Sequence, residues 1–178
     1  PMKHGVDKIL HDLVVTPEAH QAVADFPYRQ LIGSLSFPSC HAKLEIRHAI
    51  SLLSRHLCDW DATCISAALD LLAYCVYSHD VGLIWSRGTD PHGHNVPYAF
   101  SDSGFQAPRS QGCRIVKMNN AAISLTSQRH TTVDTSTTAA ELSEVFLASN
   151  DIAGFRNMMT EMGMWLDGPT TIYCDCQP

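Results

Sequence analysis

The first half of the chain is patterned as a series of helices. Hydrophobic residues recur there at spacings of three and four, which is the period of an amphipathic α-helix with one buried face. Residues 28–37 (YRQLIGSLSF) form an apolar stretch that we expect to be a helix ended by Pro38, and Asp59 or Asp61 can cap a later helix. The predicted inner faces of the two helices after Pro38 are Ile46, Ile50, Leu53 and Leu57, and then Ile65, Leu69, Leu72 and Val76.

The second half is patterned as strands around one long helix. Short apolar stretches bounded by turn residues predict strands, and Asn119-Asn120 is expected to join two of them as a tight hairpin. A long helix is predicted from about Ser136 to Gly163. The predicted strands are 81–85, 96–102, 113–118, 121–127 and 171–175. The predicted buried stripe of the long helix is Val145, Ala148, Ile152, Phe155, Met159 and Met162.

The change from helical to strand-like patterning falls at a segment rich in turn-forming residues. This segment, SRGTDPHGHN (86–95), is predicted to be a linker. The expected organisation is a lead-in over 1–27, a helical domain over 28–85, the linker, and a strand-containing domain over 96–178. The fold class expected from this order is α+β (mixed α/β).

Composition describes an ordinary globular protein. The chain has 178 residues, of which 45% are hydrophobic and 17% charged, and it holds no apolar run of the ~18 residues that a membrane helix needs. We therefore expect no membrane association. Its seven cysteines are odd in number, scattered and without a C-x-x-C pair, which favours a reducing intracellular compartment over a disulfide framework. The chain begins with Pro1-Met2 and stops soon after Asp175, so we expect it to be part of a longer protein.

The net charge of −6 has the wrong sign for binding nucleic acid by bulk electrostatics. Locally, however, one stretch carries four basic residues and no acid. These four residues are candidate nucleic-acid contacts or, equally, an ordinary solvated face. They are Arg109, Arg114, Lys117 and Arg129.

Three acidic residues stand at the ends of predicted elements, namely Asp102, Glu141 and Asp175. Each has a simple structural role available: Asp102 in a turn, Glu141 in a capping box with Thr138, and Asp175 at a strand end. If the first strand is central and the last one returns parallel beside it after a helical crossover, the three meet at one edge of the sheet. Clustered carboxylates repel, so such a cluster suits two magnesium ions, which can cleave a phosphodiester.

Cysteines flank the last of these acids, which leaves a cysteine metal site as an alternative. Cys174 and Cys176 would need further ligands at a usable spacing, and the sequence offers none with a recognised pattern.

Several stretches resemble the copia-type retrotransposon reverse transcriptase, from the end of its polymerase region through its ribonuclease H domain. The similarity runs from Tyr28 to Gln177. The polymerase-like stretches are YRQLIGSL (28–35) and AISLLSR (49–55). The stretches similar to the ribonuclease H domain are FSDSGFQA (100–107), RSQGC (109–113), AISLTSQRH (122–130), TTAAEL (137–142) and IYCDCQ (172–177).

The resemblance implies that Asp102, Glu141 and Asp175 are the first three metal-binding carboxylates of a ribonuclease H. They would hold two Mg²⁺ ions, with Mn²⁺ as an alternative, and hydrolyse the RNA strand of RNA–DNA hybrids. Cys174 and Cys176 would then be small strand residues. The implied partners are the hybrid and the polymerase and integrase regions of the polyprotein. The implied location is intracellular, in the cytoplasm, a virus-like particle or the nucleus.

The implied fold is a helical, thumb-like connection followed by a ribonuclease H-like fold that is incomplete at its C-terminus. The chain departs from the family pattern at several points: Phe105 replaces a tryptophan, Ala139 replaces an acid, and no Y-x-D-D motif is present. The helices and fourth acidic residue expected after Asp175 are also missing, so we expect these residues alone to be inactive. The alternative is an inactive remnant of such an element, acting at most as a nucleic-acid-binding or structural module.

Overall fold

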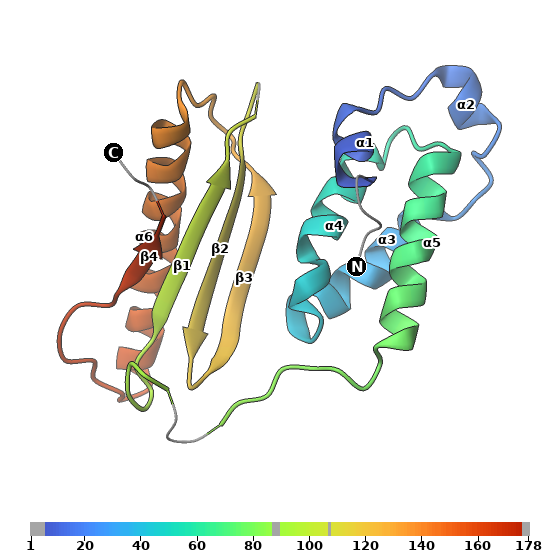
Figure 1. The fold of residues 1–178 in the computed structure, drawn as a ribbon. Helices are drawn as coiled ribbons and strands as arrows, with labels where there is room; N and C mark the ends of the chain where they lie inside the picture. The colour runs from blue at the N-terminus through green and yellow to red at the C-terminus, as the bar shows by residue number, and fades with distance from the viewer. Residues whose placement is uncertain (1–5, 87–89, 107, 176–178) are drawn as a thin grey trace. The chain divides into compact units, whose positions relative to one another are not determined.

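The computed structural model describes residues 6–86, 90–106 and 108–175 (Figure 1). The chain divides into two compact units, Pro1–Gly82 and Leu83–Pro178. The described part of the first unit is helical, and the second combines a mixed four-stranded sheet with a long helix. The predicted α+β fold class is therefore confirmed. Across the described ranges, no helix is both long and apolar enough to cross a membrane.

The helical unit is built around one continuous apolar core. Tyr28 is fully buried in it, and its hydroxyl donates a hydrogen bond to the backbone carbonyl of Leu53 at 2.9 Å. The Tyr28 ring also stacks on Trp60, with 5.5 Å between the ring centroids. The elements of this unit are α1 (Val6–Asp12), α2 (Pro17–Gln21), α3 (Tyr28–His41), η1 (Leu44–Ile46), α4 (Arg47–Leu53), η2 (Ser54–His56) and α5 (Ala62–Tyr77).

The helix predicted to stop at Pro38 does not stop there. Helix α3 continues to His41, because Pro38 removes only one backbone donor near the helix end. The carbonyl of Pro38 then accepts hydrogen bonds from the backbone N–H groups of Ala42 and Lys43, which complete the last turn.

The predicted inner face of α5 is wrong at three of its four positions, whereas Ile65 is half-buried against the core as predicted. Leu69, Leu72 and Val76 are 45%, 37% and 65% exposed. The helix instead buries smaller side chains, which allow a closer approach to the core, together with one leucine. The buried residues are Cys64, Ala67, Ala68 and Leu71. Asp61 caps this helix, since its carboxylate accepts a hydrogen bond from the Cys64 backbone N–H at 3.0 Å.

No strand forms at 81–85, in contrast to the prediction. The segment leaves α5 through a turn in which the Val81 backbone N–H donates to the Ser78 carbonyl at 3.0 Å. The Lys43 ammonium donates to the carbonyls of both Ser78 and Val81. Those carbonyls are therefore directed at a side chain and not at a neighbouring strand.

The second unit has a central first strand. The sheet order is β3-β2-β1-β4, with β1 antiparallel to β2, β2 antiparallel to β3, and β1 parallel to β4. Helix α6 lies along one face of this sheet (Figure 1), where Ile152 packs on Ala99 and Val116. The elements are β1 (Tyr98–Gly104), β2 (Gln111–Met118), β3 (Ala121–Arg129), α6 (Thr137–Glu161) and β4 (Ile172–Cys174).

The predicted hairpin between β2 and β3 is confirmed. Asn119 and Asn120 have φ values of 53° and 64°, the two positive angles that a type I′ turn needs. The preceding segment packs on this turn: Asp90 accepts a hydrogen bond from the Asn120 backbone N–H at 2.8 Å, and Asn95 is hydrogen-bonded to Asn119. The predicted linker therefore belongs in part to the second unit, while 87–89 lie outside the described residues.

Helix α6 begins and ends with identifiable caps. Ser136 is the N-cap, because its hydroxyl accepts a hydrogen bond from the Ala139 backbone N–H at 3.1 Å. The predicted capping box of Thr138 and Glu141 is therefore wrong. At the other end Gly163 has a φ of 79° and closes the helix as predicted. Of the predicted stripe, Ala148, Ile152 and Met159 are buried, whereas Val145 and Phe155 are half-buried and Met162 is 65% exposed.

Candidate active site

The carboxyl ends of β1 and β4 lie side by side at one edge of the sheet. Phe100 pairs with Tyr173, and Ser101 pairs with Cys174, in the parallel ladder. Asp102 and Asp175 each come one residue later, so the parallel pairing brings the two acids to the same level of the sheet. Both line one open hollow on the surface. Its lining residues are Phe100, Ser101, Asp102, Tyr173, Cys174 and Asp175.

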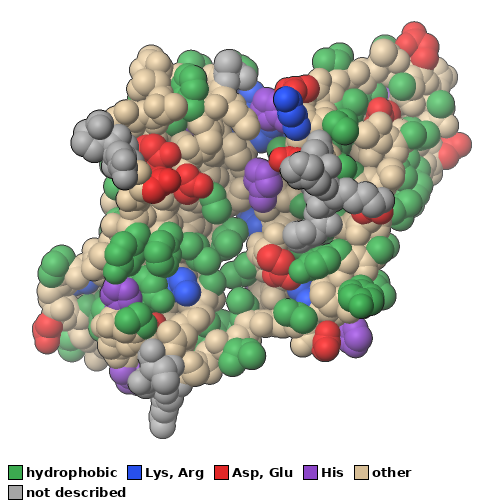
Figure 2. All heavy atoms as spheres, viewed as in Figure 1, with side chains coloured by type: hydrophobic (Ala, Val, Ile, Leu, Met, Phe, Trp, Pro, Cys, Tyr) green, Lys and Arg blue, Asp and Glu red, His purple; other side chains and the backbone are tan. Residues whose placement is uncertain are grey.

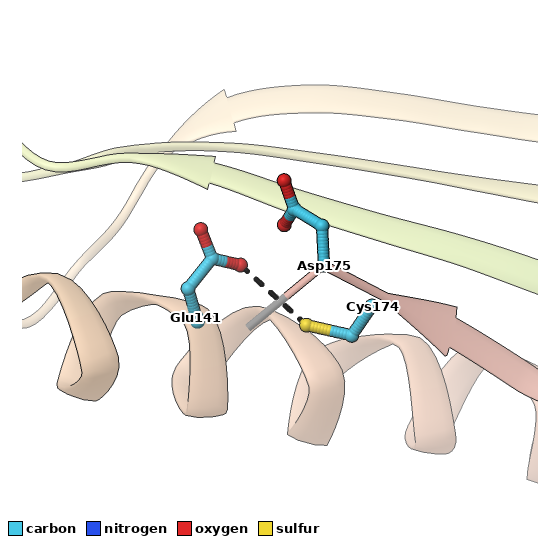
Figure 3. Close-up of side chains that lie close together, drawn as sticks. All are labelled: Glu141, Cys174 and Asp175. Atoms are coloured by element: carbon cyan, nitrogen blue, oxygen red, sulfur yellow. Dashed lines mark hydrogen bonds between the residues drawn. The ribbon is translucent and has the colours of Figure 1, made fainter. Parts of the chain in front are cut away.

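Glu141 reaches this edge from the first turns of α6. One ligand atom from each of Glu141, Cys174 and Asp175 lies within 4.8 Å of the other two (Figure 3). The Cys174 thiol donates a hydrogen bond to Oε2 of Glu141 at 3.7 Å. Figure 2 shows acidic side chains gathered on the surface of the sheet unit. The structure thus brings Glu141 and Asp175 together directly, with Asp102 on the neighbouring strand.

The electrostatics of Glu141 reflect this crowding. Its pKa is raised above the ordinary value, first by burial and then by the negative charges of Asp102 and Asp175. Hydrogen bonds from the Cys174 thiol and from the Ser103 backbone N–H act in the opposite direction without cancelling the rise. Like-charge repulsion of this kind is what a divalent cation relieves.

The donor set fits a divalent cation. Carboxylate oxygens are the ligands that Mg²⁺ and Mn²⁺ prefer. Arg114 is paired with Glu144 and Asp151, and among the described residues no Lys or Arg forms an ion pair with any of the three site carboxylates. Asp102, Glu141 and Asp175 therefore have no side-chain cation to neutralise them among those residues.

One of the predicted nucleic-acid contacts must be withdrawn. Arg114 is only 8% exposed, and its guanidinium is paired with both Glu144 and Asp151. It points into the interior between β2 and α6, because the two acids that neutralise it are on that helix. Arg109 and Arg129 are exposed, and the ammonium of Lys117 lies over the Tyr98 ring at 5.7 Å from its centroid.

The sequence left Cys174 either as a ligand of a cysteine metal site or as a small strand residue, and it did not predict the hydrogen bond of its thiol to Glu141. The alternation of side chains along a strand does indicate this contact. Tyr173 and Asp175 are on one face of the sheet, so Cys174 between them is on the other. The residue between them therefore turns toward α6, where it contacts Glu141. Cys176 lies outside the described residues.

Comparison with known proteins adds to this geometry. The chain is 26% identical over 152 residues to the retrovirus-related Pol polyproteins from transposons RE2 and RE1 of Arabidopsis thaliana. The aligned region is 83% of this chain and 10% of each relative, so the chain spans about a tenth of the length of these relatives. No family model and no solved structure matches. The similarities support a retroelement origin, in the Pol polyprotein of a transposon.

Proposed function

We propose that this chain is part of a retrotransposon reverse transcriptase, in which 96–178 form a ribonuclease H-like domain that hydrolyses the RNA strand of RNA–DNA hybrids. One observation carries the proposal. Glu141, from a crossover helix, and Asp175, after a strand parallel to β1, reach the edge of the sheet where Asp102 lies.

The three carboxylates would hold two Mg²⁺ ions, with Mn²⁺ as an alternative. When bound, such a pair of ions supplies an activated water and stabilises the leaving oxygen of a phosphodiester. Asp102 would contribute its oxygens from β1 and Asp175 from the residue that follows β4, while Glu141 would contribute from the first turns of a capped helix. The hydrogen bond from the Cys174 thiol orients Glu141 toward the edge.

The strand order supports this proposal. A first strand with an antiparallel neighbour on one side, a crossover helix, and a fourth strand that is parallel to it on the other side is the arrangement that the resemblance implies. The similarity to Pol polyproteins points the same way. Within a polyprotein, the partners would be its polymerase and integrase regions, and the location the cytoplasm, a virus-like particle or the nucleus.

An inactive remnant is the second candidate, and one observation favours it. Asp102 is not a member of the group of ligand atoms that lie within 4.8 Å of one another, so the described site is not drawn together around all three acids. In that case the domain would serve at most in binding nucleic acid or as a structural module.

A hybrid-cleavage assay separates the two candidates. The polyprotein region that includes this chain and its downstream sequence is incubated with labelled RNA–DNA hybrid and Mg²⁺, beside residues 1–178 alone. We expect cleavage by the longer chain and little by the shorter. Asp102→Asn in the longer chain should abolish it, whereas Asp167→Asn, an exposed acid in the loop before β4, should not. An inactive longer chain would favour the remnant.

A further inference from the structure

A chain of charged side chains, buried except for the half-buried Asp151, lies behind the candidate site between α6 and the sheet. At its centre, Glu144 is fully buried. Its Oε1 accepts a hydrogen bond from Arg114 at 3.1 Å, and its Oε2 lies 2.9 Å from Nε2 of His130. We call the connected residues the buried network. Its members are Arg114, His130, Asp134, Glu144 and Asp151.

The network continues on both sides of Glu144. Arg114 also donates to Asp151, which lies seven residues after Glu144, about two turns further along α6. His130 lies 2.8 Å from Asp134 through its Nδ1, and the Ser143 hydroxyl donates to the same carboxyl group at 3.2 Å. Both nitrogens of His130 thus face carboxylate oxygens. The ring therefore links Glu144 on α6 to Asp134 in the segment before that helix.

Glu144 occupies the face of α6 that the sheet covers. Ala140 and Ala148, one turn before and after it, are also fully buried. A Cβ at Gly112 on β2 would lie 1.9 Å from Oε2 of Glu144, so the carboxylate rests directly against the strand backbone. The side chain is therefore fixed against β2 as well as by its two ionic partners.

Stability alone is a poor explanation for this arrangement. Removing two charges from water is costly, and well-packed apolar residues of similar volume often hold such an interface equally well. What directional ion pairs add over apolar contacts is a defined rotation and height of the helix against the sheet. Glu141 is three residues before Glu144, about one turn of the helix, so any slide or rotation of Glu144 displaces Glu141 as well.

We propose that the buried network positions the Glu141 carboxylate at the sheet edge, with Arg114, His130 and Glu144 as its positioning residues. The inference rests on the proposed function only for its catalytic consequence. The position of the Glu141 carboxylate at the sheet edge can be tested without metal or substrate.

The Ser103 backbone amide provides a readout of that position, because it lies close enough to the Glu141 carboxylate to lower its pKa. In ¹H–¹⁵N spectra, Glu141→Ala defines the Ser103 amide shift when the carboxylate is absent. We expect Glu144→Gln to move the Ser103 signal toward that value. Asp134→Asn, a milder change at the far end of His130, should move it in the same direction and keeps the test valid if Glu144→Gln fails to fold.

Met159→Ala is the matched control. Met159 is fully buried on the same helix and lies about 27 Å from Glu141 along its axis. Its truncation should destabilise the unit and leave the Ser103 shift unchanged. An unmoved Ser103 signal in the network variants, or an equal movement in Met159→Ala, would overturn the proposal.

Activity gives a second, separable readout. In the longer polyprotein region, Glu144→Gln should lower kcat for hybrid cleavage by about 100-fold with KM unchanged, because displacement of a reacting group by about 1 Å has such an effect. If the unaltered protein neither binds Mn²⁺ nor cleaves hybrid but the Ser103 shifts behave as expected, the positioning role stands and the proposed function falls. A fall in kcat without any Ser103 movement would contradict positioning.

Discussion

The Cys174 thiol donates a hydrogen bond to Glu141 although the two residues are 33 positions apart in the sequence. This bond lowers the pKa of Glu141, against the larger effects of burial and of the neighbouring acids. We therefore expect Cys174→Ala to raise the Glu141 pKa further, as measured by ¹³C NMR titration of side-chain carboxyl groups. Cys58→Ala, an exposed cysteine of the helical unit, should leave the titration unchanged.

The raised pKa of Glu141 also predicts how stability depends on pH. A carboxyl whose folded-state pKa lies above its unfolded value contributes stability below the unfolded value, and this contribution is lost as pH rises through the folded value. Glu141→Gln should therefore raise the free energy of unfolding at neutral pH in metal-free buffer, and the gain should shrink in acid. Urea unfolding at several pH values measures it. A lower free energy of unfolding for Glu141→Gln than for the unaltered protein at neutral pH would contradict repulsion between Glu141 and the neighbouring acids.

The pKa of Asp134 is shifted in the opposite direction to that of Glu141, below its ordinary value. Burial alone would raise its pKa, but side-chain hydrogen bonds, including those from His130 and Ser143, lower it. The stability that Asp134 contributes is present above its unfolded pKa and is lost as pH falls through its folded one. Asp134→Asn should therefore flatten the acid side of the stability profile, whereas Asp167→Asn should leave that side unchanged.

Breaking the buried Arg114–Glu144 ion pair should lower the free energy of unfolding far more than replacing both residues with apolar ones. Glu144→Gln removes the acid that Arg114 and His130 share and leaves Arg114 paired with Asp151 and His130 with Asp134. Breaking a buried ion pair in this way costs about 3–5 kcal/mol. The double variant Arg114→Met with Glu144→Leu removes both charges and should recover most of that loss. Chemical denaturation of the three proteins provides the comparison. A double variant that is no more stable than Glu144→Gln would show that the two residues do not act as a pair.

The N-cap of α6 offers a local test. Ser136→Ala should destabilise the sheet unit by about 1 kcal/mol, because it removes the acceptor for the Ala139 amide. Thr138→Ala, two residues further and exposed, should have little effect. Thermal unfolding distinguishes the two variants. A larger loss of stability for Thr138→Ala than for Ser136→Ala would show that Ser136 is not the N-cap.

Sequence patterns predicted best what depends on nearby residues. The Asn119-Asn120 turn follows from the conformational preference of asparagine, and the end of α6 follows from Gly163. The edge where Asp102, Glu141 and Asp175 lie was expected from strand topology and a family resemblance. Patterns that depend on distant partners were misleading.

Two errors illustrate this dependence. Arg114 looked like a surface contact because its partners, Glu144 and Asp151, lie at least 30 residues away. The spacing of Leu69 and Leu72 predicted that they lie on the buried face of α5, yet this helix packs through Ala67 and Ala68. Helical spacing identifies apolar faces, but the face that is buried depends on which neighbour fits most closely.

The parallel pairing of β1 with β4 has a consequence for the order of folding. Strands β1, β2 and β3 are consecutive antiparallel neighbours and can pair through short connections as soon as they exist. The Ser101 hydroxyl, by contrast, finds its partner at Tyr173, 72 residues later. Closing a loop of that length carries an entropic cost before any contact offsets it. The hairpins can therefore form early, while the carboxylate cluster assembles last, once α6 has docked and β4 has been added to the edge.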